Sequence, residues 1–469
     1  MKRYQALAEE LARSIRTGLL KPGDRLPSVR HASASRGISP ATVFEAYYLL
    51  EARGLVQARP RSGYYVSSTP PPALPAEPET ASQPDGQSRP VEISERVFQV
   101  LESTMHRDVV PLGSAFPSPL YFPLDKLGRA LAASATALDP WSTVDDLTPG
   151  NAELRRQIAL RYLIDGVQVD PREIVISNGA MEALNLCLSA LTRPGDTVAV
   201  ESPCFYAALQ ALEQHGLHAL EVATDPREGI DLAALETAIE RHRPAACWLM
   251  TNFQNPLGSA MGADKKRALA ELLARRQLPL IEDDVYAELY FGARPAPTRA
   301  FDREGWVLHC SSFSKALAPG YRIGWVSSPR YARQLARQKL ISTLATCVPA
   351  QAALARYLER GTYDRHLQHL RRSLQHNQGQ YTDAIARYFP AGTRVSRPGG
   401  GYFLWLELPG GIDTLALQRR AADAGISLAP GPLFSASRGF RHCLRLNYGH
   451  PFDARAEVAL KTLGQWLTE

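Results

Sequence analysis

One lysine and one arginine stand close together in a segment without any acid. The stretch SSFSKALAPGYRIGW, residues 311–325, places Lys315 seven positions before Arg322. A primary amine can bond covalently to an aldehyde, and a planar guanidinium can bind two oxygens of a phosphate. Pyridoxal 5'-phosphate carries both groups. We therefore predict that Lys315 binds the aldehyde covalently and that Ser312 and Arg322 bind the phosphate. The alternative for any single lysine is an exposed surface position.

The elements around this segment alternate between apolar β-branched runs and helical stretches. EIVISNG leads into AMEALNLCLSAL, and DTVAVES leads into CFYAALQALEQHG. This alternation indicates an α/β domain with a mainly parallel sheet covered on both faces. From about residue 370 a long helix, a strand pair near GGGYFLWLEL and a final helix predict a smaller α/β lobe.

Ligands of open α/β sheets lie beyond the carboxyl ends of the strands. Gly179 and Ala180 follow one predicted strand and begin a helix, so their N–H groups form an anion site or belong only to a tight turn. Phe205 follows the next strand and lies against an aromatic ring or packs in the core. Asn255 precedes a proline, and its amide binds a phenolic oxygen or sits in a simple turn.

Two further polar motifs come later in the chain. In IEDDVYAEL, Asp283 and Tyr286 follow the apolar run LPLI. A carboxylate there can keep a pyridine nitrogen protonated, whereas the alternative is a solvated acidic turn. Arg445 lies in a short apolar run, HCLRLNYG, and requires an anion, either a substrate carboxylate or a structural ion-pair partner.

The N-terminal segment carries the positive charge of the chain. Residues 1–66 hold eleven Lys and Arg against five acids, an excess that equals the net charge of +6 for the whole protein. A basic head on a neutral body suggests a polyanionic partner. Residues 67–90 contain seven prolines in twenty-four positions, which predicts an extended linker over 67–92 between a head, 1–66, and a body, 93–469.

The head follows the pattern of a winged helix-turn-helix. Ser28 and Gly37 bound one short helix, Ser39 caps a second one that begins at Pro40, and two strand-like runs follow. Recognition helices read bases from their N-terminal residues while basic neighbours hold phosphates. The predicted DNA contacts are Arg25, Arg30, Ser39, Thr42, Arg61 and Gly63.

These motifs resemble two families. In order, those of the body are similar to the aspartate aminotransferase family, fold type I of the pyridoxal-phosphate enzymes, and those of the head resemble the GntR family. The fusion resembles the MocR subfamily of transcription regulators. The resemblance implies Asn255 and Tyr286 on the 3'-oxygen of the cofactor, Asp283 on its ring nitrogen, Gly179 and Ala180 at its phosphate, Phe205 on its ring and Arg445 on a carboxylate. Asp145 stands where aminotransferases usually carry a tyrosine.

The resemblance implies a homodimeric regulator that binds a double-stranded DNA operator. A small amino compound would form an external aldimine at the Lys315-bound cofactor and alter DNA binding. A working aminotransferase and a sensor of free pyridoxal phosphate remain alternatives. The six cysteines fall singly, so neither disulfides nor a metal site is expected. The absence of an apolar leader and of a long apolar run predicts a cytoplasmic protein without membrane segments.

Overall fold

The computed structural model describes residues 3–52, 54–59, 62–67, 74–102 and 107–469. The chain forms two compact units, and each is described by itself. The first contains Met1–Ala76, Ser373–Thr393 and His450–Glu469. The second contains Glu77–Arg372 and Arg394–Gly449. Within the described residues, no helix is both long and apolar enough to cross a membrane.

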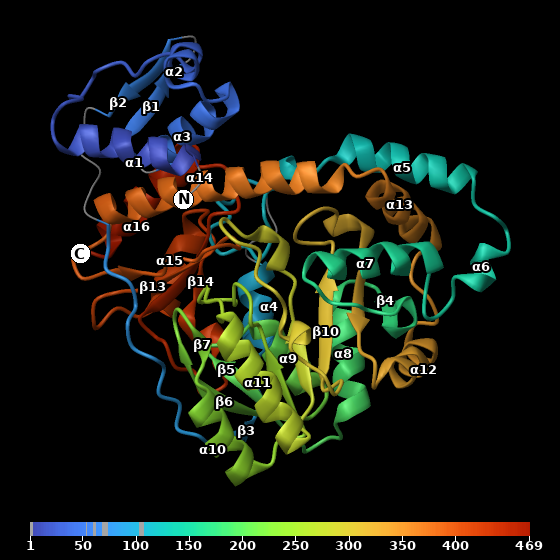
Figure 1. Cartoon of the computed structure of the whole chain (residues 1–469). Coiled ribbons are helices and arrows are strands. Elements are labelled where there is room, and N and C mark those ends of the chain that lie inside the picture. Colours follow the sequence, from blue (N-terminus) through green and yellow to red (C-terminus); the bar gives the residue numbers. More distant parts are fainter. Residues whose placement is uncertain (1–2, 53, 60–61, 68–73, 103–106) are drawn as a thin grey trace. The chain divides into compact units, whose positions relative to one another are not determined.

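The head has the predicted winged helix-turn-helix (Figure 1). Its elements are α1 (Arg3–Arg16), α2 (Val29–Arg36), α3 (Pro40–Ala52), β1 (Val56–Arg59) and β2 (Gly63–Val66). The two strands pair antiparallel, and apolar side chains of all three helices share one core with Val56 and Val66. As the sequence predicts, the Ser28 hydroxyl accepts a hydrogen bond from His31 N–H, and Gly37 ends α2 with a φ of +61°.

The second unit is built on a large sheet. Its strands, in spatial order, are β3 (Ser88–Pro90), β6 (His218–Asp225), β5 (Thr197–Ser202), β8 (Ala246–Leu249), β9 (Leu280–Asp283), β10 (Val307–Ser312), β11 (Gly324–Ser327) and β4 (Ile174–Ser177), with β7 (Gly229–Ile230) paired to β6. Strands β6, β5, β8, β9 and β10 run parallel, and β11 and β3 run antiparallel to their neighbours. The predicted, mainly parallel α/β sheet is therefore confirmed.

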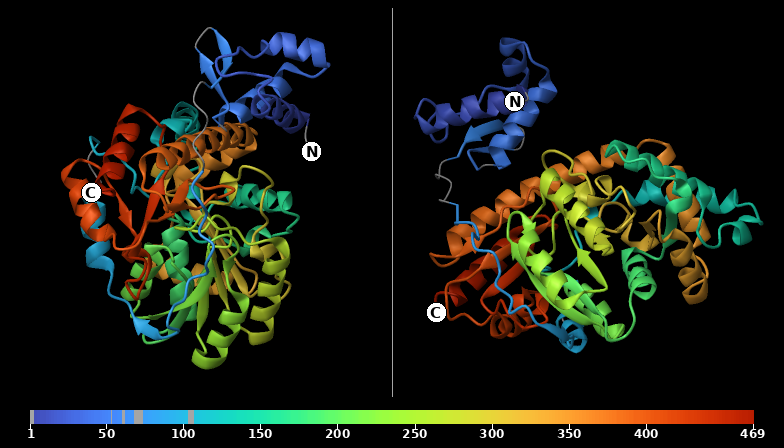
Figure 2. Two further views of the ribbon diagram at one scale, coloured as in Figure 1. Left: turned by 90° about the vertical axis from the view of Figure 1, so that its left-hand side faces the viewer. Right: turned by 60° about the horizontal axis from the view of Figure 1, so that its bottom comes forward.

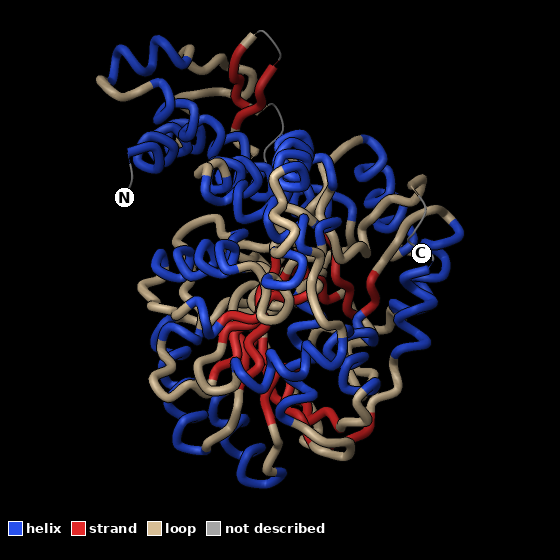
Figure 3. Tube along the Cα trace, turned by 90° about the vertical axis from the view of Figure 1, so that its right-hand side faces the viewer, coloured by secondary structure: helices blue, strands red, loops and turns tan. Residues whose placement is uncertain are grey.

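Helices enclose this sheet because nearly every strand position is buried, so both faces need an apolar cover (Figures 2 and 3). The helices between its strands are α8 (Ala180–Leu191), α9 (Tyr206–Gln214), α10 (Leu232–His242) and α11 (Ala263–Arg276). Helix α8 contacts β4, β9, β10 and β11, and α10 contacts β5 and β6. Between β3 and β4 the chain also forms α4 (Ser94–Glu102), α5 (Leu124–Thr136), α6 (Ser142–Asp145) and α7 (Ala152–Ile164).

The predicted smaller lobe contains a four-stranded sheet in the order β12 (Arg394–Val395), β13 (Phe403–Glu407), β15 (Cys443–Asn447) and β14 (Ala429–Pro430). Its strands are antiparallel, with Trp405 opposite Arg445. The remaining helices are α12 (Ala332–Ser342), α13 (Val348–Glu359), α14 (Tyr363–Tyr388), α15 (Thr414–Asp423) and α16 (Ala454–Trp466).

The second half of the proline-rich segment contacts the second unit directly. Ser82 N–H donates to the Thr224 carbonyl at 3.1 Å, and Thr224 N–H donates to the Ser82 hydroxyl at 3.0 Å. Ser88–Pro90 then adds β3 to the edge of the large sheet. Residues 77–92 thus belong to the second unit, although the sequence predicts a linker as far as residue 92.

A close backbone contact fixes the start of β11 against the start of α8. A Cβ at Gly324 would lie 2.5 Å from Gly179 C and 2.6 Å from Ala180 N, and backbone atoms cannot give way as a flexible side chain can. We therefore expect Gly324→Ala to lower the free energy of unfolding by about 1–3 kcal/mol. Urea denaturation followed by circular dichroism measures this change.

Gly320→Ala is the matched control, because nothing lies within 4 Å of the Cβ that it would add. Equal denaturation midpoints for the two variants would show that the β11–α8 contact is less rigid than the structure indicates.

Candidate functional site

The polar residues singled out in the sequence lie after strands of the large sheet, at the edge where parallel strands present their carboxyl ends. Gly179 follows β4, Phe205 follows β5 and Asn255 follows β8. Asp283 is the last residue of β9, and Lys315 comes three residues after β10. The topology therefore brings together, at one edge of the large sheet, residues that are up to more than a hundred positions apart in the sequence.

Lys315 lies at the centre of this group. Its Nζ donates to the Ala115 carbonyl at 2.9 Å and stands 3.9 Å from the centroid of the Phe116 ring. Burial of the amine and the nearby Arg445 guanidinium lower the pKa of Lys315 to about 7, although Asp283 acts in the opposite direction. The amine is thus available in its uncharged, nucleophilic form near neutral pH.

Asp283 faces Lys315 from the end of β9 and is 1% exposed. Burial and the adjacent Asp284 raise the pKa of Asp283 to about 7, while Lys315 opposes this rise. Its Oδ1 is buried without a hydrogen-bond partner among the described residues. A buried carboxylate oxygen without a donor is costly, so this position suits a protonated ring nitrogen.

Asn255 and Tyr286 are both fully buried near these groups. Among the described residues, Asn255 Nδ2 has no hydrogen-bond partner, whereas its Oδ1 accepts from Arg445 Nη1 at 3.1 Å. Burial raises the pKa of the Tyr286 hydroxyl, so this group stays protonated at neutral pH. Both side chains can therefore donate a hydrogen bond to a phenolic oxygen.

The phosphate residues meet where α8 begins. Gly179 has a φ of +79°, which favours glycine, and a Cβ there would displace the Arg322 guanidinium. Arg322 Nη1 donates to the Ser314 hydroxyl at 3.1 Å, and Ser314 N–H donates to Ser312 Oγ at 3.0 Å. Ala180, at the first position of α8, adds a helix N-terminus, which favours an anion.

Phe205 is half-buried before α9, with its ring centroid 5.0 Å from that of Tyr206. Its predicted stacking on the ring of the cofactor therefore stays a prediction.

Arg445 is fully buried and lies 4.3 Å from the Phe403 ring. Its Nη2 donates to the Gly113 carbonyl at 2.6 Å and to the Ser114 carbonyl at 3.1 Å. Backbone carbonyls rather than a carboxylate face this guanidinium, which keeps it available for an anionic ligand.

Sequence reasoning did not identify the segment that covers these cations. Residues 113–116 place three consecutive carbonyls against Arg445 and Lys315, and Tyr402 also donates to the Ala115 carbonyl at 3.1 Å. We call residues 113–116 the strap. Its letters, GSAF, carry no ionisable group, so no sequence signal marked it.

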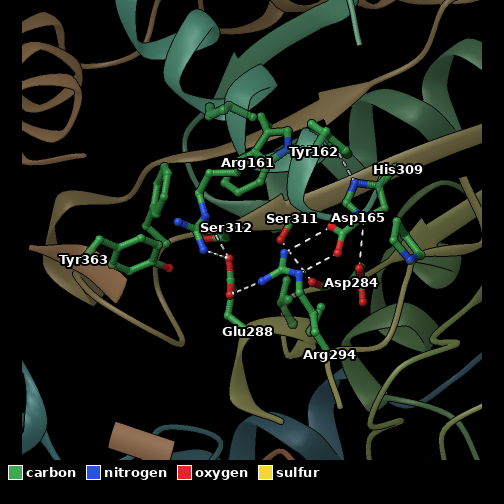
Figure 4. Close-up of a pocket in the computed structure, with 16 residues that line it drawn as sticks. Arg161, Tyr162, Asp165, Asp284, Glu288, Arg294, His309, Ser311, Ser312 and Tyr363 are labelled. Carbon is green, nitrogen blue, oxygen red and sulfur yellow. Dashed lines mark hydrogen bonds and ion pairs between the residues drawn. The ribbon is translucent and has the colours of Figure 1, made fainter. Parts of the chain in front are cut away.

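A second polar cluster was also missed. Glu288 accepts from Arg161 and Arg294, and Arg294 also binds Asp165 (Figure 4). Arg371 donates to Glu288 as well. Burial opposes the charge of Glu288, but Arg294 and its other cationic neighbours outweigh burial and lower the pKa of the carboxyl. The cavity there is about 40 Å³, room for a few waters only, so this cluster is structural.

Asp284 belongs to the same region, on the opposite face of the strand from Asp283. It accepts from His309 Nε2 at 2.9 Å and from Asn252 Nδ2 at 2.9 Å. Burial lowers the pKa of His309, but Asp284 outweighs burial and raises it. Of the two aspartates in EDDVY, Asp284 thus serves the internal network and Asp283 is left for a ligand.

The head contains most of the predicted DNA contacts on its surface. The Ser39 hydroxyl lies 2.8 Å from that of Thr42 at the start of α3, and Arg30 is exposed on α2. Arg25 lies beside the wing, where a Cβ on Gly63 would come within 3.5 Å of its guanidinium. Arg61 lies outside the described residues.

The wing contains a cation that the sequence did not single out. The Arg59 guanidinium stands 4.4 Å from the centroid of the Tyr65 ring, and that of Arg25 stands 6.0 Å from it. Stacking on one ring holds two cations at the same side of β2.

A winged helix-turn-helix joined to an α/β body with a reactive lysine defines a class of protein: a DNA-binding transcription regulator with an aminotransferase-like domain. Residues 146–463 match the family described as aminotransferase class I and II, and residues 3–66 match bacterial regulatory proteins of the gntR family. The chain belongs to the HTH-type transcriptional regulators in which these two families are fused. Pyridoxal 5'-phosphate is the cofactor of the aminotransferase domain.

The relatives support both halves. The HTH-type transcriptional regulator YdcR of Escherichia coli (strain K12) is 48% identical over 100% of both chains. YjiR of the same organism is 39% identical, over 99% of this chain and 98% of that protein. The crystal structure of LysN, an alpha-aminoadipate aminotransferase from Thermus thermophilus, superposes with a TM-score of 0.73 and 30% identity, covering 79% of this chain and 94% of that one.

The lowered pKa of Lys315 leads to a pH prediction. The uncharged fraction of the amine grows as the pH rises through about 7, whereas an ordinary lysine would need a pH near 10. Covalent attachment of added pyridoxal phosphate, fixed with borohydride, should therefore accelerate between pH 6 and 8 and then level off.

Mass spectrometry of peptides locates the attachment. Lys315→Ala should abolish it, and Lys461→Ala, a change at an exposed position of α16, should not. A rate that keeps rising up to pH 10 would contradict the lowered pKa.

Proposed function

We propose that this protein is a pyridoxal-phosphate-dependent transcription regulator of the MocR type that responds to a small amino compound. The observation that carries the proposal is Lys315, a lysine three residues after β10 with a pKa lowered to about 7, in the same chain as a basic winged helix-turn-helix. The bound cofactor supplies an aldehyde that exchanges amines. Lys315 would hold this aldehyde through its amine, and an effector amine that displaced it would pass its two hydrogens to the Lys315 nitrogen, which would become a free amine again.

Arg445 defines the class of effector. It is buried, lies against aromatic rings and donates only to neutral oxygens in the described structure. A guanidinium in such surroundings gains most from an anionic partner. We therefore propose an α-amino acid, whose amine reaches the cofactor while its carboxylate binds Arg445 beside Asn255.

The strap offers a physical route from ligand to response. Gly113 and Ser114 occupy hydrogen-bond positions of Arg445, and Ala115 occupies that of Lys315. A carboxylate on Arg445 and a released lysine amine both change these bonds. The strap must then move, and a ligand that favours one strap position shifts the population of body conformations.

We further propose a homodimer that binds an operator of two half-sites. The second unit exposes large apolar side chains, among them Leu120 at 83%, Ile341 at 72% and Trp141 at 71%, which are costly to leave in water. The operator geometry stays open, because a proline-rich linker permits direct as well as inverted repeats. We also propose a cytoplasmic location, because a transcription regulator has to reach the DNA.

Lys315→Ala separates the two roles of the chain. The variant should bind DNA with the affinity of the unaltered protein, because the winged helix-turn-helix is intact, but should not change that affinity when pyridoxal phosphate and amino acids are added. Fluorescence anisotropy with duplex DNA selected from a random library measures both. An undiminished amino-acid response in Lys315→Ala would rule out the amine exchange.

The second candidate function is a working aminotransferase, favoured by the cofactor-binding residue types around Lys315, which match the family except at Asp145, where a tyrosine is usual. Steady turnover of an amino donor with a keto acid at about 1 s⁻¹ or faster would support it. A single half-reaction without turnover supports the regulator. A sensor of free pyridoxal phosphate would respond to the cofactor without any amino acid.

The role of Arg445 is tested by pairing each active amino acid with the amine that lacks its carboxylate. We expect the unaltered protein to prefer the amino acid by about 100-fold, roughly the value of one charge-assisted bidentate contact. Arg445→Lys should lose most of this preference. A planar guanidinium donates to both oxygens of a carboxylate at once, whereas an ammonium acts only as a point charge. A preference that survives unchanged would exclude a carboxylate from this position.

A further inference from the structure

The recognition helix α3 has one apolar face that the core uses and a second apolar patch that it does not use. Val43, Ala46, Tyr47 and Leu50 recur at helical spacing and are buried in the head. Phe44 lies on the other side of the helix and is 55% exposed. Ala41, three positions earlier on the same side, is also exposed.

The polar groups of α3 are unsuited to reading purines. Its sequence, PATVFEAYYLLEA, contains no Arg, Lys, Asn or Gln, the side chains that make two hydrogen bonds to guanine or adenine. The Thr42 hydroxyl lies within hydrogen-bond distance of Ser39 Oγ, and Glu45 can only accept when ionised. This helix therefore cannot read a purine through two hydrogen bonds from one side chain, and its exposed apolar groups are a further means of reading sequence.

We infer that Phe44, with Ala41 beside it, recognises the 5-methyl group of thymine in the major groove. This methyl is the apolar feature that the groove of normal DNA offers, and Phe and Ala are side chains that contact it. The inference rests on the proposed DNA-binding function. Arg25 and Arg30, both exposed on the head, supply the phosphate contacts that hold the helix in the groove.

The chemistry of this contact predicts a specific preference. Removing one buried methyl costs about a fourfold loss in affinity, so uracil in place of a contacted thymine should weaken binding by that factor. Cytosine lacks the methyl as well, whereas 5-methylcytosine presents a methyl at the same place.

The experiment selects duplexes from a random library with the full-length protein and then replaces each thymine of the enriched sequence by uracil. We expect one or two positions per half-site at which the unaltered protein binds thymine about fourfold more tightly than uracil. Phe44→Ala should bind the two duplexes equally, and Phe44→Leu should keep part of the difference. Phe98→Ala, a change at a side chain of similar exposure, 56%, on α4, is the matched control and should keep all of it.

The possible results are distinct. Equal binding of thymine and uracil duplexes by the unaltered protein would overturn the role of Phe44 while leaving DNA binding intact. A Phe44→Ala variant that binds both duplexes more weakly but keeps the thymine preference would show that the ring only supports the helix, and would overturn the inference too. A library in which no sequence is enriched would instead count against the proposed function itself.

Discussion

The amine of Lys315 lies in low-dielectric surroundings with two guanidiniums and one carboxylate nearby, and this balance of charge governs the site. A cation in such a place loses its proton more easily than it would in water. The same burial that lowers the pKa of Lys315 raises that of Asp283, because both groups avoid uncompensated charge. Each can be stabilised by a ligand that brings the missing partner.

The strap supplies the hydrogen-bond acceptors for these buried cations. Its carbonyls are neutral acceptors, so they satisfy donors of Lys315 and Arg445 without neutralising either. A carboxylate can therefore replace these carbonyls on the guanidinium, because a hydrogen bond between two charged groups is stronger than one to a neutral acceptor. The charged cluster around Glu288 serves the opposite purpose, since its three arginines and acids satisfy one another and leave little for a ligand.

Sequence patterns predicted the helices and strands well where their bounds depend on interactions between residues close together in the chain. The caps Ser28 and Gly37 bound α2 because a hydroxyl and a left-handed glycine act within a few residues. The order of the strands along the chain and the polar residues at their ends were predicted for the same reason. The strap and the ion pairs of Glu288 with Arg161 and Arg371 were not, because they join residues more than eighty positions apart with no periodic signal. The docking of Ser82 on Thr224 likewise depends on a sheet edge that exists only after folding.

The sequence by itself determined the two-part organisation, the alternating α/β character of the body, the basic head and the residue types of a pyridoxal-phosphate site. It did so because hydrophobic periodicity, caps, proline content and net charge are properties of neighbouring residues. Only the tertiary structure decided which cations are satisfied by the strap, which of Asp283 and Asp284 is left for a ligand, and that Phe44 remains exposed on α3. Those outcomes depend on burial and on distances between remote segments, which packing sets.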